Sequence, residues 1–341
     1  MVVLCVVFFC VSVSGFAFFY SQNHYFGALE TVSRIDTSES VYIGGMAIGI
    51  SVKSDGVMVQ ELIEIQTAYG LAMPKSNLQE GDIIVEINGQ KIFNADDITV
   101  LLENYSKNDK ALSVRVLRDT KEKLISAYPM LEEYTDNYKL GIKTRDYAEG
   151  IGTVTYIKTN GEFASLGHPI NSNGGKRIIP CNGGNIFDCR ISGFSKGKKG
   201  NPGELRGTFA NQSSPMGKVD KNSRFGVYGK FTLMPPPTEK VTIAPRSQVK
   251  TGKAYIYTTI GDRPEKFEIH INKSLPQSMA SEKGIVFSVT DKALLNATGG
   301  ILQGMSGSPI IQDNRLVGAV THVFLNDPTK GYGVYMDWMF E

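Results

Sequence analysis

The stretch GMSGSPIIQDNRLVGAV, residues 304–320, combines a glycine-flanked turn, a proline and two apolar runs joined by Asp313-Asn314. Glycines permit the positive φ angles of a tight turn, and an Asp-Asn pair between β-branched runs is typical of a hairpin. The stretch therefore predicts a turn followed by a β-hairpin, with Ser306 and Ser308 both in the turn.

Serine catalysis requires a base for the hydroxyl proton and backbone N–H groups directed at the oxyanion. This turn can point the amides of Gly304 and Ser306 into one hollow, so we predict that these two residues form the oxyanion hole. Ser308 precedes a proline, which restricts its backbone, and we assign it a structural role. The pattern G-x-S-G-x-P followed by a hairpin resembles that of chymotrypsin-like proteases. A plain glycine turn is the alternative.

The chain has four histidines from which a base can come. His168 lies between a glycine and a proline in FASLGHPI, at the end of a predicted strand, and precedes the serine as the order His, Asp, Ser requires. His24 borders an apolar segment, His270 lies in an alternating strand and His322 follows the hairpin, where a local structural role is expected. We predict that His168 is the general base.

The acid that orients this histidine is harder to choose because carboxylates are plentiful. Such a residue should be half-buried at the end of a strand. Asp291 follows an apolar run in VFSVTDKALL and fits this description best, while Asp188 and Asp262 are rivals.

The chain from residue 132 to residue 341 is rich in glycine and in short β-type runs, with few segments of helical periodicity. This pattern of short β-type runs predicts an all-β sandwich or a pair of β-barrels. The predicted strands are residues 151–157, 240–244, 254–260, 266–271, 284–290 and 315–324.

Residues 41–131 have a different pattern, in which a predicted helix accompanies the predicted strands. GDIIVEINGQKI (81–92) is a strand followed by Asn88-Gly89, a strong hairpin signal; residues 94–106 predict a helix and residues 111–119 an alternating strand. This order resembles a PDZ domain, a small α/β module. The resemblance makes GGMAIGI the carboxylate-binding loop and peptide-accepting strand, that is Gly44, Gly45, Met46, Ala47, Ile48, Gly49 and Ile50. A β-rich domain without a ligand is the alternative.

The first 20 residues carry no charge, and Glu30 is the first charged residue. About 20 apolar residues span a bilayer, so residues 1–22 are predicted to be a transmembrane anchor. Ser12-Val13-Ser14 also resembles a signal-peptide cleavage site, which keeps a cleaved signal open. Residues 23–40 are interpreted as a linker.

Composition limits the partners. With 36 Lys+Arg against 34 Asp+Glu, the formal net charge is +2, which does not favour nucleic-acid binding. Cys181 and Cys189 could form a disulfide in an exported domain, but they lack the spacing and further ligands of a zinc site. No metal or organic cofactor is expected.

Taken together, the N-terminal apolar segment, the PDZ module and the motifs SLGHPI, GNPGELRG, VTD, GMSGSPII and GAVTHVFLNDPTKGYGVYMDW resemble the SpoIVB family of sporulation serine peptidases. The resemblance covers about residues 40–341 and implies a triad of His168, Asp291 and Ser306. It also implies export into the space between the forespore and mother-cell membranes. There the peptidase would cleave itself and a membrane-bound regulator of an intramembrane protease.

A second hypothesis keeps the same domains without catalysis. The chain would then be a catalytically silent PDZ adaptor that binds peptide termini at a membrane.

Overall fold

The computed structural model describes residues 38–104, 111–118, 121–171, 178–210 and 213–340. The predicted membrane segment, residues 1–22, and almost all of the predicted linker lie outside these ranges. Within them, no helix combines the length and the apolar character needed to cross a bilayer.

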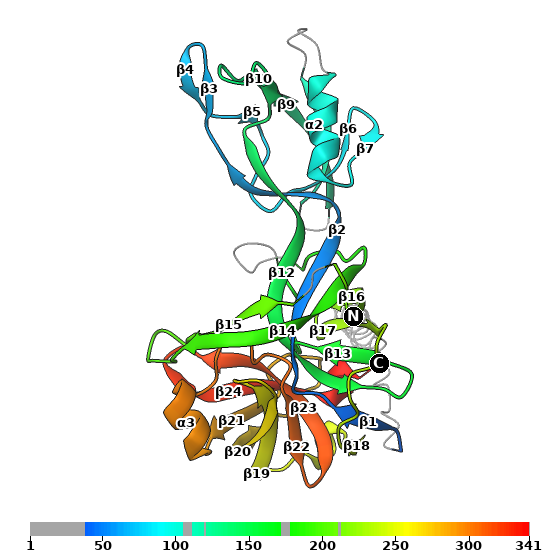
Figure 1. Ribbon diagram of the computed structural model, residues 1–341, viewed down its shortest axis with the longest axis vertical. Coiled ribbons are helices and arrows are strands. Elements are labelled where there is room, and N and C mark those ends of the chain that lie inside the picture. Colours follow the sequence, from blue (N-terminus) through cyan, green and yellow to red (C-terminus); the bar gives the residue numbers. More distant parts are fainter. Residues whose placement is uncertain (1–37, 105–110, 119–120, 172–177, 211–212, 341) are drawn as a thin grey trace, which may run out of the picture. The chain divides into compact units, whose positions relative to one another are not determined.

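Strands predominate in the described chain, as the sequence predicted, and many of them close into two barrels (Figure 1). The first barrel is a ring of antiparallel strands in which each pairs with the next and the last returns to the first. In ring order these are β2 (Ala47–Leu62), β12 (Ile142–Ile157), β13 (Glu162–Ser165), β17 (Gly226–Phe231), β16 (Gly217–Ser223) and β14 (Gly184–Ser195).

The second barrel is formed in the same way by the C-terminal part of the chain. Its ring runs β19 (Gly252–Thr259), β20 (Pro264–Ser274), β21 (Ile285–Val289), β24 (Asp327–Tyr335), β23 (Arg315–Phe324) and β22 (Pro309–Gln312), which pairs back to β19. The predicted hairpin after the glycine turn is β22 and β23, with Asp313 and Asn314 at positive φ between them. The prediction of a barrel pair is thus confirmed by the strand pairing itself.

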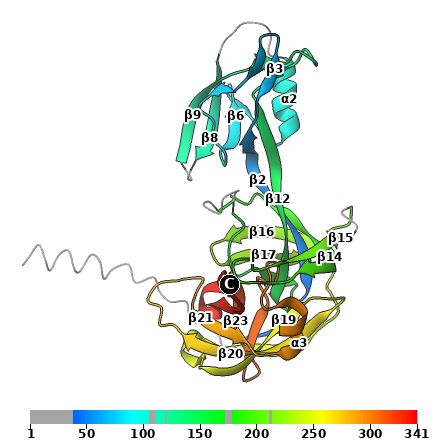
Figure 2. The same cartoon turned by 90° about the vertical axis from the view of Figure 1, so that its left-hand side faces the viewer.

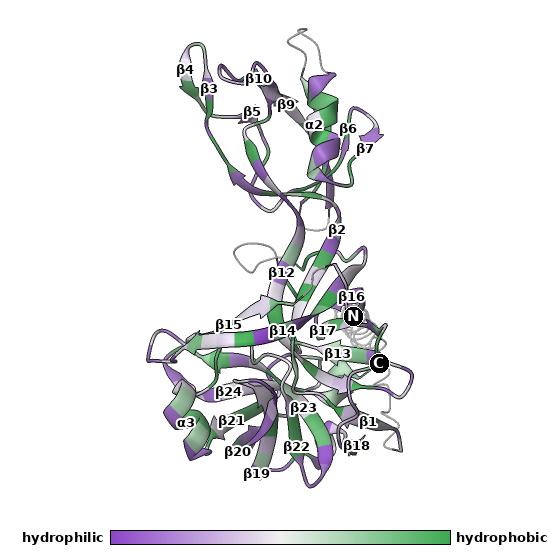
Figure 3. Ribbon diagram, in the orientation of Figure 1, coloured by the Kyte–Doolittle hydropathy of each residue, from purple (hydrophilic) through white to green (hydrophobic). Residues whose placement is uncertain are grey.

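Alternation along the strands gives each barrel its own core. In β19 and β20 the buried positions recur at every second residue, as a half-buried strand requires. Ile256, Ile269 and Phe287 lie in the core of the second barrel, and Ile50, Val154 and Phe163 in that of the first. Figure 3 shows apolar and polar residues interleaved along many of these strands.

Short elements complete and connect the barrels. β1 (Ser40–Ile43) pairs with β12 of the first barrel and with β18 (Lys240–Ile243), which runs parallel to β23 of the second. The remaining elements here are β15 (Glu204–Phe209), which pairs with β14, the 3-10 helix η1 (Arg246–Gln248), α3 (Lys292–Thr298) and α4 (Met336–Met339).

The PDZ-like region, residues 56–146, lies between the barrel portions of β2 and β12 along the chain (Figure 2). Asn88 and Gly89 both have positive φ, the conformation of the predicted hairpin turn. Helix α2 (Ala95–Glu103) begins at Asn94, whose side chain forms a capping box with Asp97. The other elements are β3 (Ile65–Thr67), β4 (Gly70–Ala72), β5 (Lys75–Ser76), β6 (Ile83–Ile87), β7 (Gln90–Lys91), β8 (Leu112–Arg118), β9 (Lys121–Tyr128), β10 (Met130–Leu131) and β11 (Tyr138–Lys139).

The structure corrects the predicted role and domain of residues 44–50. Gly44 and Gly45 connect β1 to β2, and Ala47, Ile48, Gly49 and Ile50 belong to the first barrel. Gly49 pairs with Ile151 of β12 on one side and with Phe187 of β14 on the other. Because both edges of the strand are occupied, it cannot accept a peptide as an added strand. Residues 41–55 therefore belong to the barrels, and the PDZ-like region extends past residue 131 into β12.

Candidate active site

Ser306 lies in a tight turn that enters β22. Gly304 and Gly307 have φ angles of 96° and 95°, which suit glycine. The Ser306 hydroxyl donates to the carbonyl of Thr321, at 2.9 Å. Ser308, in contrast, is fully buried, and its hydroxyl donates to the Met305 carbonyl at 2.7 Å. The structure therefore agrees that Ser308 is structural and that Ser306 faces the open side of the turn.

Several carbonyls of this turn are bound to β12, and two of its amides make no hydrogen bond to the described chain. Thr153 binds two carbonyls at 3.0 Å: its hydroxyl donates to Gly304 and its amide to Ser306. The amides of Gly304 and Ser306 donate to no described residue. An oxyanion hole requires preorganised donors that are free to bind the developing oxyanion, and these two uncommitted amides are candidates for that role.

His168 follows β13, in a loop where Leu166 and Gly167 both have positive φ. Its Nδ1 lies 2.9 Å from the carbonyl of Pro169. With a proton on Nδ1 donated to this carbonyl, Nε2 is left as the acceptor, which is the form a general base requires. Asn222 holds the loop, because its side chain accepts from the Ile170 amide and donates to the Ile170 carbonyl.

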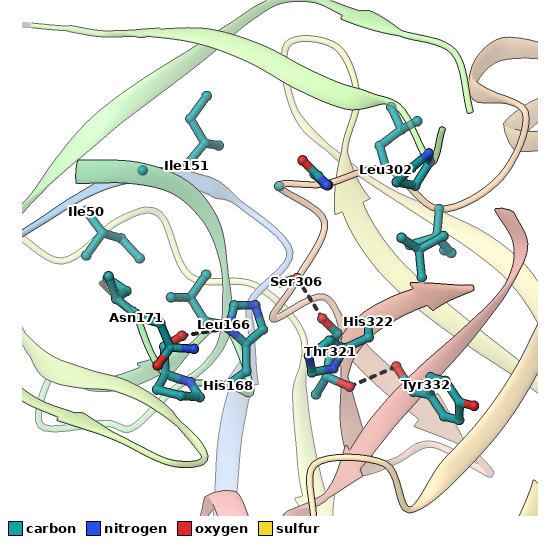
Figure 4. Close-up of a pocket in the computed structure, with 18 of the residues that line it drawn as sticks. Ile50, Ile151, Leu166, His168, Asn171, Leu302, Ser306, Thr321, His322 and Tyr332 are labelled. Atoms are coloured by element: carbon teal, nitrogen blue, oxygen red, sulfur yellow. Dashed lines mark hydrogen bonds between the residues drawn. The ribbon is translucent and has the colours of Figure 1, made fainter. Parts of the chain in front are cut away.

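Ser306 and His168 line one cavity of about 620 Å³ (Figure 4). His322 lies in the same cavity, with its ring 5.4 Å from that of His168, centroid to centroid. The two catalytic candidates come from different barrels, since His168 follows β13 and Ser306 precedes β22. Most of the wall is apolar, and it is formed by Ile50, Ile151, Leu166, Pro169, Ile170, Pro202, Ile301, Leu302, Val323, Leu325 and Tyr332, with Glu149, Gly150, Asn171, Lys283, Gln303, Gly304 and Thr321 completing it.

Burial favours the neutral form of both histidines. It lowers the pKa of His168 below its usual 6.5, although the bond to the Pro169 carbonyl and the charge of Glu282 act in the opposite direction. Burial also lowers the pKa of His322 to about 4, helped by His168 and Lys283. The carboxylate of Glu282 lies beside this pair, 3.8 Å from Nε2 of His322.

The structure does not bring the predicted acid, Asp291, to His168. Its carboxylate is the N-cap of α3, where Oδ1 accepts from the amides of Ala293 and Leu294 at 2.9 and 3.0 Å. Helix α3 lies at the outer side of the second barrel (Figure 1), and Asp291 is not among the residues that line the cavity. The prediction of Asp291 as the orienting acid is corrected here: its carboxylate is committed to the helix.

A cap of this kind has a measurable effect on stability. We expect Asp291→Ala to lower the free energy of unfolding by about 1 kcal/mol, because two amides of α3 lose their acceptor. Asp291→Asn keeps an acceptor at the cap and should stay close to wild type. Urea denaturation of the three proteins measures the difference, and equal losses for both variants would contradict a capping role.

The sequence interpretation missed three residues at this site. His322 was expected to have only a local structural role, yet it lines the cavity. Glu282 and Thr321 were not singled out, although Thr321 is buried and its hydroxyl donates to the Glu282 carbonyl at 2.9 Å. Thr321 and His322 lie in β23, the second strand of the hairpin that follows Ser306, and this position was their only signal in the sequence. Glu282 precedes β21 and had no such signal.

The two cysteines outside the N-terminal segment are both free. Cys181 is half-buried and Cys189 buried, and burial raises the pKa of the Cys189 thiol to about 11. Neither of them lines the cavity that holds Ser306 and His168.

A second cavity of the protein, of about 270 Å³, lies in the PDZ-like region, and residues 44–50 do not line it. Ile98 and Leu102 of α2 line one side of it, and residues 137–142 line another. Gly141 has a φ of 65° at the point where the chain enters β12. The string YKLGIK, residues 138–143, has this glycine between two apolar residues, a signal that could have indicated the groove.

Comparison with known proteins identifies the C-terminal part of the chain. A family model described as SpoIVB peptidase S55 matches residues 136–340, which confirms the resemblance drawn from the sequence motifs. Among solved structures, the chain is similar to the inactive form of the Rv3671c protease, with 14% identity, a TM-score of 0.32, and 56% of this chain and 80% of that chain covered. The active form of the Rv3671c protease from M. tuberculosis has 14% identity and a TM-score of 0.31, with 57% of this chain and 71% of that chain covered. Human heparin binding protein has 9% identity and a TM-score of 0.29, with 55% of this chain and 81% of that chain covered. No curated protein matches the chain.

Proposed function

Since the chain belongs to the SpoIVB peptidase S55 family, we propose that it is a serine endopeptidase in which Ser306 is the nucleophile and His168 the general base. The observation that carries this proposal is their position in one cavity, from separate barrels, beside two uncommitted amides. A glycine turn with only a structural role would not require a histidine from the other barrel or leave these amides unpaired.

The reaction begins with a rotation of the Ser306 hydroxyl from the Thr321 carbonyl towards Nε2 of His168. His168 accepts the proton as Oγ bonds to the scissile carbonyl carbon, and the amides of Gly304 and Ser306 stabilise the oxyanion. His168 then gives its proton to the leaving amine, and the C–N bond breaks. In the second half of the reaction, His168 accepts a proton from a water molecule as the water oxygen bonds to the acyl carbon. The ester bond to Ser306 then breaks, and His168 returns the proton to Oγ, which restores both side chains.

The pH dependence of peptide hydrolysis tests the role of His168. Because its pKa lies below 6.5, the basic form persists below pH 6.5, and kcat/KM should fall only as pH drops through this lowered pKa. Glu282→Gln removes a charge that raises the pKa of His168, so it should move the acid limb to still lower pH. An acid limb centred above 6.5, or one that moves upward in Glu282→Gln, would contradict this assignment.

For the natural substrates we propose the chain itself and a membrane-bound regulator of an intramembrane protease. Support comes from the family assignment and from the uncharged N-terminal segment, which indicates export or anchoring. In this proposal the peptidase acts between the forespore and mother-cell membranes of a sporulating bacterium and signals from one cell to the other.

A second activity, peptide binding by the PDZ-like region, is supported by the cavity beside α2. The bound peptide would lie between α2 and residues 137–142, and not along residues 44–50. A catalytically silent adaptor would retain this groove but would fail to react with a fluorophosphonate at Ser306.

A further inference from the structure

We propose that the peptidase prefers a large apolar side chain at the substrate residue whose carbonyl is attacked. This inference rests on the proposed function and adds the class of side chain that the cavity accepts. Its basis is the composition of the cavity wall on one side of Ser306.

The chemistry decides which wall receives that side chain. His168 must give its proton to the leaving amine, so the part of the substrate after the scissile bond lies on the His168 side, where Ile50 and Leu166 are. The acyl part lies on the opposite side of Ser306. Figure 4 shows Leu302 and Tyr332 on that side.

The wall on the acyl side is apolar. Leu302 is only 1% exposed and lies two residues before Gly304, whose amide would bind the oxyanion. Val323 follows His322 in β23 and lines the same cavity. Burying an apolar side chain of leucine or phenylalanine size against such a wall is favourable, because it removes apolar surface from water.

A charged side chain would find little compensation on this wall. Lys283 lines the cavity, but it is exposed and its ammonium lies over the Tyr332 ring, 5.1 Å from the centroid. His322 is neutral near pH 7, so it adds no charge that would attract an acidic residue. An Asp or Lys side chain would lose its hydration without gaining a buried partner, which is unfavourable.

The test uses peptidyl diphenyl phosphonates that differ only in the residue that bears the phosphonate: Leu, Phe, Ala, Asp or Lys. We expect the Leu and Phe probes to inactivate the full chain about 10 to 200 times faster than the Ala probe, and the Asp and Lys probes to be slower than Ala. Val323→Asp should lower the rate with Leu and raise the rate with Lys. Leu233→Asp, which puts the same charge at a residue 74% exposed and outside the cavity, should leave the order unchanged.

Circular dichroism shows whether Val323→Asp folds. Val323→Ala is a second variant, and it should lower the ratio of the inactivation rate with the Leu probe to that with the Ala probe. Equal rates for all five probes, or an Asp probe faster than Leu, would overturn the apolar preference while leaving the peptidase intact. Absence of any Ser306-dependent reaction, with these probes and with a simple fluorophosphonate, would instead overturn the proposed function.

Discussion

Replacement of Ser306 by alanine is expected to abolish labelling by a fluorophosphonate and to lower kcat by about 10⁶-fold, the loss typical of a serine nucleophile. The fold should persist, because the only hydrogen bond that the Ser306 hydroxyl makes to the described chain is to the Thr321 carbonyl. One such bond contributes about 1 kcal/mol. Gel fluorescence after labelling, with circular dichroism as a check of folding, measures both effects.

Ser308→Ala is the matched control two residues away. It removes a buried hydroxyl that donates to Met305, so stability should fall by about 1 kcal/mol while labelling persists. If Ser306→Ala is still labelled, or if Ser308→Ala alone loses labelling, the nucleophile has been assigned to the wrong serine.

The same two variants test self-cleavage. Wild type and Ser308→Ala should shorten at the N-terminus and Ser306→Ala should not. A cut within residues 40–43 is disfavoured, because Ser40–Ile43 forms β1 and pairs with strands on both sides. N-terminal sequencing should therefore place the cut before Ser40, and trimming in all three proteins would exclude self-cleavage.

Gly307→Ala is expected to lower the free energy of unfolding by about 4 kcal/mol or more, a loss that requires a specific structural cause. Gly307 has a φ of 95°, and a Cβ there would lie 2.0 Å from the Thr153 carbonyl oxygen and 2.4 Å from the Leu166 amide nitrogen. Both atoms are backbone and cannot rotate away. Thermal unfolding should show a fall in Tm of about 10 °C or more.

Gly261→Ala is the control for this substitution. Nothing lies within 4 Å of a Cβ at Gly261, and its φ is outside the range that favours glycine. Its stability should stay within about 0.5 kcal/mol of wild type. A Gly307→Ala protein as stable as this control would mean that the turn can relax, and that its geometry is not fixed by the contact with Thr153.

Much of the fold could be predicted because its signals are local. The hairpin around Asp313-Asn314, the turn at Asn88-Gly89 and the helix that begins after Asn94 depend on the conformational preferences of adjacent residues. For the same reason Ser306 could be separated from Ser308, since the proline that follows Ser308 is itself a local constraint.

The errors concern contacts between residues distant in sequence. Gly44–Ile50 has the composition of a peptide-accepting segment, but β14, more than 130 residues later, covers its second edge. Asp291 has the expected position at the end of a strand, yet the start of a helix uses its carboxylate. In both cases the local pattern was compatible with two environments, and only tertiary packing distinguishes them.

Strands β2 and β12 have a practical consequence for anyone who wants to separate the two proposed activities. Residue 142, in the wall of the groove beside α2, and Thr153, which holds the turn of Ser306, belong to the same continuous strand. The PDZ-like region is thus an insertion between two barrel strands and not a detachable N-terminal module. A deletion of residues 41–131 would remove a barrel wall, whereas an excision between residues 56 and 146, closed by a short loop, would leave a complete barrel.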